Sequence, residues 1–392
     1  MTLSFGGREL FDRIALNQLC HHALTPIVPF YVHAMPAISM IEISGDMLEG
    51  GGQIIRTAIA LAALAGVDVR ITKIREKRPN PGLRPQHVTA VRAIAAISNA
   101  ETQGLAQGSR ELEFRPHSHN SGTFRLDVGT AGSIPLMLQA LMPCLNFSSD
   151  QITLELTGGT DVKWSPPIDY LKLVVMPTLQ KMEYSSTITV NRRGHYPRGG
   201  GSVTITVQPS HSLNAITRLN RGELQSIEGL SHCVKLPHHV AQRQTEAAKR
   251  KLNDSGLSKL RIENETYPPE KDTHLGPGSG IVLAAQFSDG SILGADSLGD
   301  RGKPAETVGQ EAADKLITEI RSNAPIDRHL GDILIPYMAV AKGRSEIQVS
   351  ELTLHTITNI TVTETILGVK FSVEGNQHKS AKISVEGINL QT

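Results

Sequence analysis

The feature that most constrains the fold is a recurring order of elements, in which a strand leads through a glycine-rich turn into an apolar helix and further strands. Residues 41–43 alternate as a strand, the three glycines at 50–52 form the turn, and residues 53–64 follow as a helix rich in Ala, Leu and Ile. The order recurs with a strand at 123–128 and a helix at 134–145. Because helices and strands alternate at this spacing, the chain is predicted to be an α/β (α+β) protein.

This pattern is interrupted by a stretch of different composition and then resumes. Residues 219–323 hold a polar segment with a basic run, a break rich in Gly and Pro, and a long amphipathic helix. An apolar helix at 333–341 and further strands then return to the first pattern. We therefore expect a smaller α/β domain at 219–323, inserted into a discontinuous domain of residues 40–218 plus 324–392.

Residues 1–39 stand outside the recurring pattern. Their apolar stretch at 23–33 is broken by Pro26 and Pro29, and no positively charged segment leads into it, so a signal peptide is not expected. We interpret residues 1–39 as an N-terminal extension that is not essential to the fold. No run of about 18 apolar residues occurs in the chain, which argues against a transmembrane helix.

Charge and cysteine content restrict the functional classes. The chain has 39 Lys and Arg against 38 Asp and Glu, which leaves a net charge of +1. A charge this small argues against a general basic field for nucleic acid, so any nucleic-acid contact must be local. The three cysteines, Cys20, Cys144 and Cys233, are too far apart for a disulfide framework or a metal-binding pair, and a cytoplasmic location is expected.

The segment Glu49-Gly50-Gly51-Gly52-Gln53-Ile54-Ile55-Arg56 is the first candidate site. Three glycines before a helix can expose backbone N–H groups to an anion, and a nearby carboxylate and arginine can hold a metal ion and a phosphate. The segment lacks the Lys-Ser/Thr ending of a P-loop. A simple glycine turn with a favourable acidic residue at the helix start remains the alternative.

The densest basic stretch lies at residues 70–84, where Glu76 is the only acidic residue among six Lys and Arg. The stretch enters a loop rich in Pro and Gly. Guanidinium groups pair bidentately with phosphate, so this loop is a candidate for binding a polyanion. A solvated basic surface is the alternative interpretation.

Two further polar residues have ordinary local interpretations. His355 lies in a β-branched segment between strands expected at 346–354 and 360–362, where a histidine is usually a satisfied polar residue. Asp332 precedes an apolar helix and is predicted to be its N-cap. The chain shows no zinc-ligand spacing, nucleophile elbow or dinucleotide fingerprint. Motifs alone therefore indicate a phosphate-handling α/β protein.

Taken together, six segments resemble the RNA 3′-terminal phosphate cyclase family, and the resemblance covers about residues 40–385. One such segment would be weak evidence, whereas six in family order with plausible spacing are strong. The segments are 49–56, 75–87, 129–133, 158–161, 196–201 and 354–356.

The resemblance implies the cyclase-active branch of this family. Its reaction is the ATP-dependent conversion of an RNA 3′-phosphate into a 2′,3′-cyclic phosphodiester, a ligase-type reaction that yields AMP and pyrophosphate. His355 matches the histidine that carries AMP before an RNA-adenylate forms. RNA 3′-phosphate ends and ATP are thus the expected partners, and Mg²⁺ or Mn²⁺ the expected metal. No membrane partner is expected, and a monomer and a homodimer both remain open.

The resemblance also implies roles for further residues. Arg56 and Arg75 join His355 as catalytic residues, and Glu49 holds the metal. The residues for the substrate phosphate and RNA end are Arg75, Arg78 and Gln86. The implied nucleotide-binding residues are Gln139, Pro166, His329, Leu330, Gly331, Asp332 and Ile333. Two of these depart from the family: some members have Tyr at the position of His329, and a frequent Gln is replaced by Ile333, which alters the expected contact with adenine.

The implied fold is a large catalytic domain of three repeated βαβαββ units with one smaller inserted α/β domain, in agreement with the interruption at 219–323. Two alternatives were weighed. A non-catalytic, cyclase-like ribosome-biogenesis factor would lack the histidine nucleophile, and an enolpyruvyl transferase-like enzyme would share the repeated units but not the segment around His355. The presence of His355, Glu49, Arg56 and Arg75 favours the cyclase.

Overall fold

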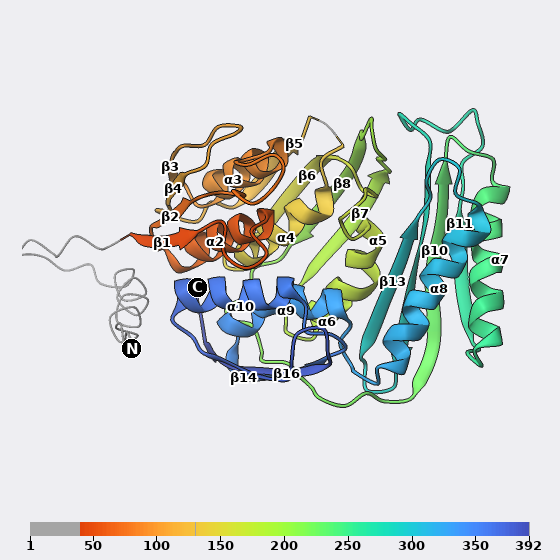
Figure 1. The fold of residues 1–392 in the computed structure, drawn as a ribbon. Helices are drawn as coiled ribbons and strands as arrows, with labels where there is room; N and C mark the ends of the chain where they lie inside the picture. The colour runs from red at the N-terminus through yellow and green to blue at the C-terminus, as the bar shows by residue number, and fades with distance from the viewer. Residues whose placement is uncertain (1–39, 130, 392) are drawn as a thin grey trace, which may run out of the picture.

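The computed structural model describes residues 40–391 except residue 130 (Figure 1). The predicted extension at 1–39 lies outside the described residues. The rest is a mixed α/β structure with four four-stranded sheets, each of which combines parallel and antiparallel pairs. The predicted α/β class is confirmed.

The first sheet and its helices lie between residues 41 and 115. Their bounds are β1 (Ile41–Ser44), α2 (Gly52–Ala65), β2 (Val69–Thr72), α3 (Pro85–Ile97), β3 (Glu101–Gln103) and β4 (Leu112–Arg115). The strand order is β1-β2-β4-β3, with β1 and β2 parallel and the other pairs antiparallel.

The second sheet follows directly and has the same connectivity. Its elements are β5 (Gly122–Asp127), α4 (Ile134–Leu145), β6 (Ile152–Gly158), α5 (Ile168–Tyr170), the π-helical turn η1 (Leu171–Val175), α6 (Met176–Gln180), β7 (Ser186–Arg192) and β8 (Gly201–Val207). The order β5-β6-β8-β7 again places its one parallel pair, β5 and β6, at an edge.

A third sheet combines a short strand before residue 219 with elements after residue 324. Its elements are β9 (Thr217–Arg218), α9 (Arg328–Val340), β14 (Lys342–Val349), α10 (Leu354–Leu367), β15 (Phe371–Glu374) and β16 (Ala381–Ile388). Its order, β9-β14-β16-β15, with β9 and β14 parallel, matches the first two sheets.

The fourth sheet is formed by the intervening segment. Its elements are β10 (Leu224–Val234), α7 (His239–Asp254), β11 (Leu260–Glu265), β12 (Gly278–Phe287), β13 (Ile292–Leu298) and α8 (Ala305–Arg321), in the strand order β11-β10-β12-β13. Figure 1 shows this sheet with α7 and α8 at one end of the molecule. Most of its apolar residues form one core with those of α7 and α8, whereas Val282, Ala284 and Ile292 join the larger core formed by the other three sheets.

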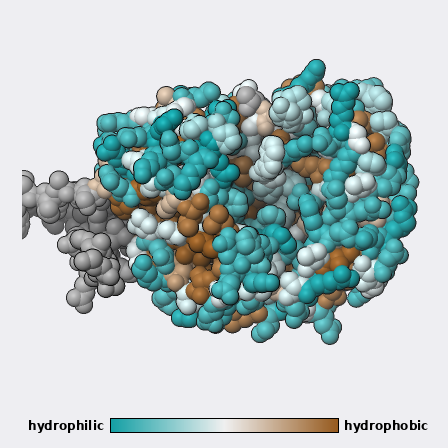
Figure 2. All heavy atoms as spheres, in the orientation of Figure 1, coloured by the Kyte–Doolittle hydropathy of each residue, from teal (hydrophilic) through white to brown (hydrophobic). Residues whose placement is uncertain are grey.

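The larger core is organised by α2, α4, α9 and α10, which pack against one another (Figure 1). The middle of α2 is an almost fully buried run of Ala, Leu and Ile, and the helix ends at Gly66 in the left-handed conformation, as its sequence predicts. On the face shown in Figure 2, hydrophobic residues gather over α4, α9 and α10 within a mostly hydrophilic surface. No helix in the described part of the chain is long and apolar enough to cross a bilayer.

Two predictions about the C-terminal elements are wrong. The strand expected at 360–362 lies inside α10, and His355 lies in the first turn of that helix. The β-branched threonines fit a helix because their hydroxyls bond back to carbonyls one turn earlier, as Thr358 does with Leu354 at 2.7 Å, and because α10 packs on α2. Asp332 is not the N-cap of α9, since Asp327 accepts bonds from the backbone N–H of His329 and Leu330.

Gly309 offers a direct test of how closely α7 and α8 pack. A Cβ at this position of α8 would lie 2.1 Å from the carbonyl oxygen of Gln244 in α7. We expect Gly309→Ala to lower the free energy of unfolding by about 1–3 kcal/mol, because the backbone clash outweighs the ~1 kcal/mol gain in helix propensity. Urea denaturation followed by circular dichroism measures the change.

The matched control is Gly276→Ala, where the nearest atom to an added Cβ lies 3.6 Å away. This variant is expected to stay within about 0.5 kcal/mol of the unchanged protein. Equal stability of the two variants would contradict the close approach of α7 and α8.

Candidate functional site

His355 lies at the N-terminal end of α10, where its side chain is exposed. The helix starts there because Thr353 caps it: the Thr353 hydroxyl accepts the backbone N–H of Thr356 at 3.0 Å. The Nδ1 atom of His355 makes a short contact with Oε1 of Gln53, in the first turn of α2. Two segments about 300 residues apart in sequence therefore meet at this histidine.

The amide of Gln53 is held in one orientation. Its Nε2 donates to Oδ1 of Asp332 at 2.9 Å and to the backbone carbonyl of His355 at 3.3 Å. Since both of these partners are acceptors, Oε1 must face the imidazole and Nδ1 of His355 must carry the proton. An imidazole with its single proton on Nδ1 keeps a lone pair on Nε2, and this atom can act as a nucleophile or a base.

Asp332 is fixed in turn by α10. Asn359 donates from Nδ2 to Oδ1 of Asp332 at 3.1 Å and to its backbone carbonyl at 2.9 Å. The hydroxyl of Thr57 donates to Oδ1 of Asn359 at 2.6 Å. A continuous chain of hydrogen bonds thus runs from α2 through α10 and α9 to His355.

Opposite charges surround a small cavity at this point. Desolvation raises the pKa of Asp332 above its ordinary value, although His355, Gln53 and Arg56 favour its charged form. Burial lowers the pKa of Arg56, while Glu49 and Asp332 oppose that shift. The cavity has a volume of about 30 Å³, and its lining includes Gln53, Arg56, Gln139, Asp332 and Ile333.

The glycine turn before α2 is shaped by two side chains that fold over it. A Cβ on Gly51 would lie 2.1 Å from Oε1 of Glu49, and a Cβ on Gly52 would lie 2.2 Å from Nε2 of His87. Glycine is therefore required at both positions for Glu49 and His87 to reach the helix start. The side chains of Glu49 and His87 therefore cover this turn.

Glu49 pairs with a predicted phosphate-binding arginine. Arg78 forms an ion pair with Oε1 of Glu49 and also donates to the Glu49 backbone carbonyl at 3.0 Å. The second carboxylate oxygen, Oε2, is buried and has no hydrogen-bond partner within the described part of the chain. Oε1 of Glu49 is thus paired with Arg78, and Oε2 is available to a ligand.

Arg75 is held by its own loop. Its guanidinium donates to the carbonyls of Asn80 at 2.7 Å and Gly82 at 3.1 Å. Desolvation, with Arg84 and Arg78 nearby, lowers the pKa of Arg75. A loop that brings three guanidinium groups together in this way is suited to binding a polyanion. The bound anion would relieve the repulsion between the three positive charges.

His87 belongs to the same cluster and was missed by sequence reasoning. Its Nδ1 accepts the backbone N–H of Arg84 at 3.1 Å, which caps the start of α3. Burial, together with Arg56, Arg75 and Arg84, lowers the pKa of His87 to about 3. The arginines in the surrounding sequence were the only available signal, since His87 itself looks like an ordinary helix residue.

The other predicted site residues do not line the small cavity. Gln86 lines a much larger cavity of about 930 Å³, between the second sheet and the fourth. His329 is exposed and packs edge-on against Tyr170, with ring centroids 6.2 Å apart. Leu330 and Gly331 are buried within α9. Among the described residues, neither Pro166 nor His329 lines either of these two cavities.

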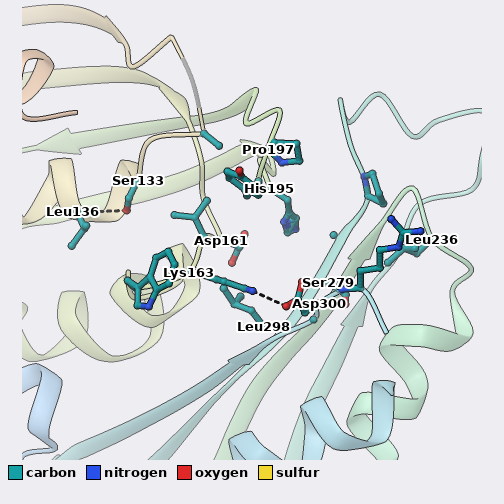
Figure 3. Close-up of a pocket in the computed structure, with 18 of the residues that line it drawn as sticks. Ser133, Leu136, Asp161, Lys163, His195, Pro197, Leu236, Ser279, Leu298 and Asp300 are labelled. Carbon is teal, nitrogen blue, oxygen red and sulfur yellow. Dashed lines mark hydrogen bonds and ion pairs between the residues drawn. The ribbon is translucent and has the colours of Figure 1, made fainter. Parts of the chain in front are cut away.

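The large cavity has a mixed lining of apolar and charged groups (Figure 3). Figure 3 shows Lys163 reaching across to Asp300, and their ion pair measures 2.6 Å. Asp161 and His195 lie at the wall formed by the second sheet, whereas Ser279 and Leu298 come from the fourth. Sequence reasoning noted the segment that holds Asp161 but assigned no role to that residue.

The family model and the similar proteins point to the same family. The model of the RNA 3′-terminal phosphate cyclase family matches residues 47–373. The chain is 48% identical over 353 residues to an RNA 3′-terminal phosphate cyclase of Ignicoccus hospitalis, covering 90% of this chain and 100% of that protein. It is 45% identical over 348 residues to one from Methanopyrus kandleri, covering 89% and 99%.

One solved structure shows a far weaker likeness. The crystal structure of the enolpyruvyl transferase NikO from Streptomyces tendae aligns with a TM-score of 0.35 and 10% identity, over 89% of this chain and 48% of that one. A score this low does not establish a shared fold.

The low pKa of His87 predicts a specific dependence of stability on pH. Below its ordinary value of 6.5, the unfolded chain binds a proton at this residue that the folded protein does not bind until about pH 3. Stability is therefore lost as the pH falls below 6.5, by up to ~1.4 kcal/mol per pH unit. In His87→Gln, the free energy of unfolding relative to the unchanged protein should rise by up to about 2 kcal/mol between about pH 7 and about pH 5.

Urea denaturation at both pH values measures this difference. The exposed His211→Gln is the matched control and should follow the unchanged protein. A His87→Gln curve parallel to that of the unchanged protein would contradict a neutral His87.

Proposed function

The chain belongs to the RNA 3′-terminal phosphate cyclase family, and we propose that it uses ATP to close an RNA 3′-phosphate into a 2′,3′-cyclic phosphodiester through an adenylylated His355. The observation that carries the assignment of His355 is its contact with Gln53. This contact fixes the proton on Nδ1 and leaves Nε2 exposed as the nucleophile.

The reaction then has three displacements at phosphorus. Nε2 of His355 attacks the α-phosphorus of ATP, a P–N bond forms, and pyrophosphate leaves. An oxygen of the RNA 3′-phosphate next attacks the same phosphorus, which breaks the P–N bond and yields an RNA-adenylate. The adjacent 2′-hydroxyl finally attacks the RNA phosphorus, the ring closes, and AMP leaves.

The hydrogen-bond chain behind His355 favours the first displacement. The imidazole gains positive charge as Nε2 forms its bond, and Oε1 of Gln53 accepts a stronger hydrogen bond from Nδ1–H as this happens. Asp332, bonded to the Gln53 amide, supplies negative charge one step further away. The arrangement is set before substrate arrives, so it needs no reorganisation.

The arginines supply the complementary positive charge. Arg56, Arg75 and Arg78 lie around the helix start beside Glu49, and phosphoryl transfer accumulates negative charge on equatorial oxygens. We assign Arg56 and Arg75 to the phosphates during catalysis, and Arg75, Arg78 and Gln86 to the RNA end. The position of Gln86 in the large cavity supports an approach of RNA from that side.

The nucleotide site is proposed beside the small cavity. Gln139 and Asp332 offer polar atoms there, whereas Ile333, Pro143 and Pro336 offer an apolar wall. Pro166, His329, Leu330 and Gly331 are proposed to complete the adenosine contacts. Ile333 provides no side-chain hydrogen bond, so adenine would be held there by apolar contact alone.

A divalent ion fits at Glu49. Its Oε2 is a buried carboxylate oxygen without a partner among residues 40–129 and 131–391, and hard cations such as Mg²⁺ and Mn²⁺ prefer carboxylate oxygen ligands. When bound, the ion would neutralise charge on the ATP phosphates. Arg78 pairs with the other oxygen, which leaves Oε2 as the atom that would contact the ion.

For the fold, we propose three βαβαββ units with the 219–323 segment inserted into the third. The shared strand order of the first three sheets, each with a single parallel pair at its edge, supports this layout. The separate apolar core under α7 and α8 supports the insertion.

Labelling with ATP that carries a labelled α-phosphate tests the function. With Mg²⁺ or Mn²⁺ present, we expect acid-labile label on the protein after a denaturing gel, and we expect none in His355→Ala, because that variant lacks the proposed nucleophile. His378→Ala, an exposed histidine bonded to Glu351, is the matched control and should label normally. No label under any metal condition would overturn the mechanism.

Gln53→Leu tests whether the amide orients the nucleophile. We expect the rate of adenylylation to fall about 10–100-fold, since a hydrogen bond to a group that becomes charged contributes about 1.5–3 kcal/mol. Gln53→Glu should restore part of the rate, because its carboxylate can still accept from Nδ1. Rates for Gln53→Leu that match the unchanged protein would show that the contact is structural only.

A further inference from the structure

A second cluster of metal-ligating side chains lies away from Glu49. It combines Asp161, which follows β6, His195, in the connection between β7 and β8, and His232, in β10 of the fourth sheet. All three residues are buried, and His232 has no exposed surface. One atom from each side chain lies within 4.8 Å of the others.

The spacing of the two imidazoles suits a shared ion. Their Nε2 atoms face each other at 3.2 Å, and Nε2 of His232 lies 3.9 Å from Oδ2 of Asp161. Two nitrogens bound to one tetrahedral zinc ion, each at about 2.0–2.1 Å, lie roughly 3.3 Å apart. The protein therefore already holds these two nitrogens at the separation that such an ion requires.

The protein satisfies only some of the polar atoms of this cluster: Oδ2 of Asp161 accepts from the Thr160 hydroxyl at 2.6 Å and from Arg193 at 3.3 Å. Oδ1 of Asp161 and Nδ1 of His232 are buried without hydrogen-bond partners among the described residues. Imidazole nitrogen and carboxylate oxygen are both ligands of protein-bound zinc, so these side chains offer suitable donor atoms.

The surrounding charge also favours a dication. Arg193 forms buried contacts with Asp161 at 3.3 Å, Asp169 at 2.7 Å and Glu265 at 2.7 Å. One guanidinium thus faces three carboxyl groups, two of which are almost completely buried. A buried surplus of negative charge is costly unless it is paired, and a divalent cation would balance it.

The backbone makes room for the two rings. A Cβ on Gly278, at the start of β12, would lie 1.7 Å from Cδ2 of His195. A Cβ on Gly280 would lie 3.1 Å from Cε1 of His232. His195 and Asp161 also line the large cavity, which gives an ion a route of entry (Figure 3).

We propose that Asp161, His195 and His232 bind a divalent transition-metal ion of the zinc class, which joins the second sheet to the fourth and leaves a fourth coordination position facing the large cavity. This site is independent of the proposed catalytic ion at Glu49, which offers only carboxylate oxygen. Scanning the sequence for zinc-ligand spacing misses it, because the three ligands come from three separate segments.

Cobalt binding tests the site in the full-length chain, purified without a polyhistidine tag and stripped of metal. Excess Mg²⁺ is added to occupy sites made of oxygen ligands, and Co²⁺ is then titrated. We expect about one Co²⁺ per chain, with the visible absorption of a site that has nitrogen ligands and low coordination number, and we expect Zn²⁺ to displace it. No visible band and no Co²⁺ retained after desalting would overturn the proposal.

Four variants separate this site from other metal contacts. His195→Asn and His232→Asn should each weaken Co²⁺ binding at least about 10-fold. Glu49→Gln and the exposed His211→Asn should leave binding unchanged. Unchanged binding in both ligand variants would equally overturn the proposal.

A thermal readout on the unchanged protein does not depend on the variants folding. Zn²⁺ should raise the apparent melting temperature of the stripped protein in the presence of Mg²⁺, because it binds only the folded state. No rise would count against the site. Since neither readout involves ATP, failure of the metal site and failure of His355 adenylylation are distinguishable.

Discussion

The arrangement of the protein depends on one buried guanidinium, that of Arg193. It contacts Asp161 and Asp169 on the side of the larger core, and Glu265 at the end of β11 on the side of the smaller core. In a medium of low polarity these contacts hold only while every charge keeps its partner, so small shifts between the two cores are resisted. The walls of the large cavity, and with them the Asp161–His195–His232 cluster, are positioned by this arrangement.

The site around His355 is positioned by apolar packing and not by buried charge. It is assembled where the N-terminal halves of α2, α9 and α10 meet, and those helices are fixed by apolar packing rather than by charge. Gln53, Asp332 and Asn359 project from that packed layer and bond to one another. Their geometry is therefore as rigid as the core beneath them, which is what a nucleophile that must be oriented before substrate arrives requires.

Regular elements were predictable where apolar periodicity was strong. The helices expected at 53–64 and 134–145 are α2 and α4, because each is a long apolar run that follows a turn containing glycine. The segment around 360–362 was wrongly predicted as a strand, because its threonines and isoleucines have local preferences for a strand. Packing on α2, together with hydroxyl bonds inside the helix, outweighs those preferences in α10.

The sequence by itself determined the α/β class and the family, and it predicted the interruption near 219 and the candidate nucleophile, since these rest on order and composition along the chain. Only the tertiary structure decided which atoms meet: that Gln53 orients His355, that Arg78 pairs with Glu49, and that His195 and His232 converge on Asp161. The physical reason is that such contacts join segments tens to hundreds of residues apart, and helix and sheet packing alone sets the distances between them.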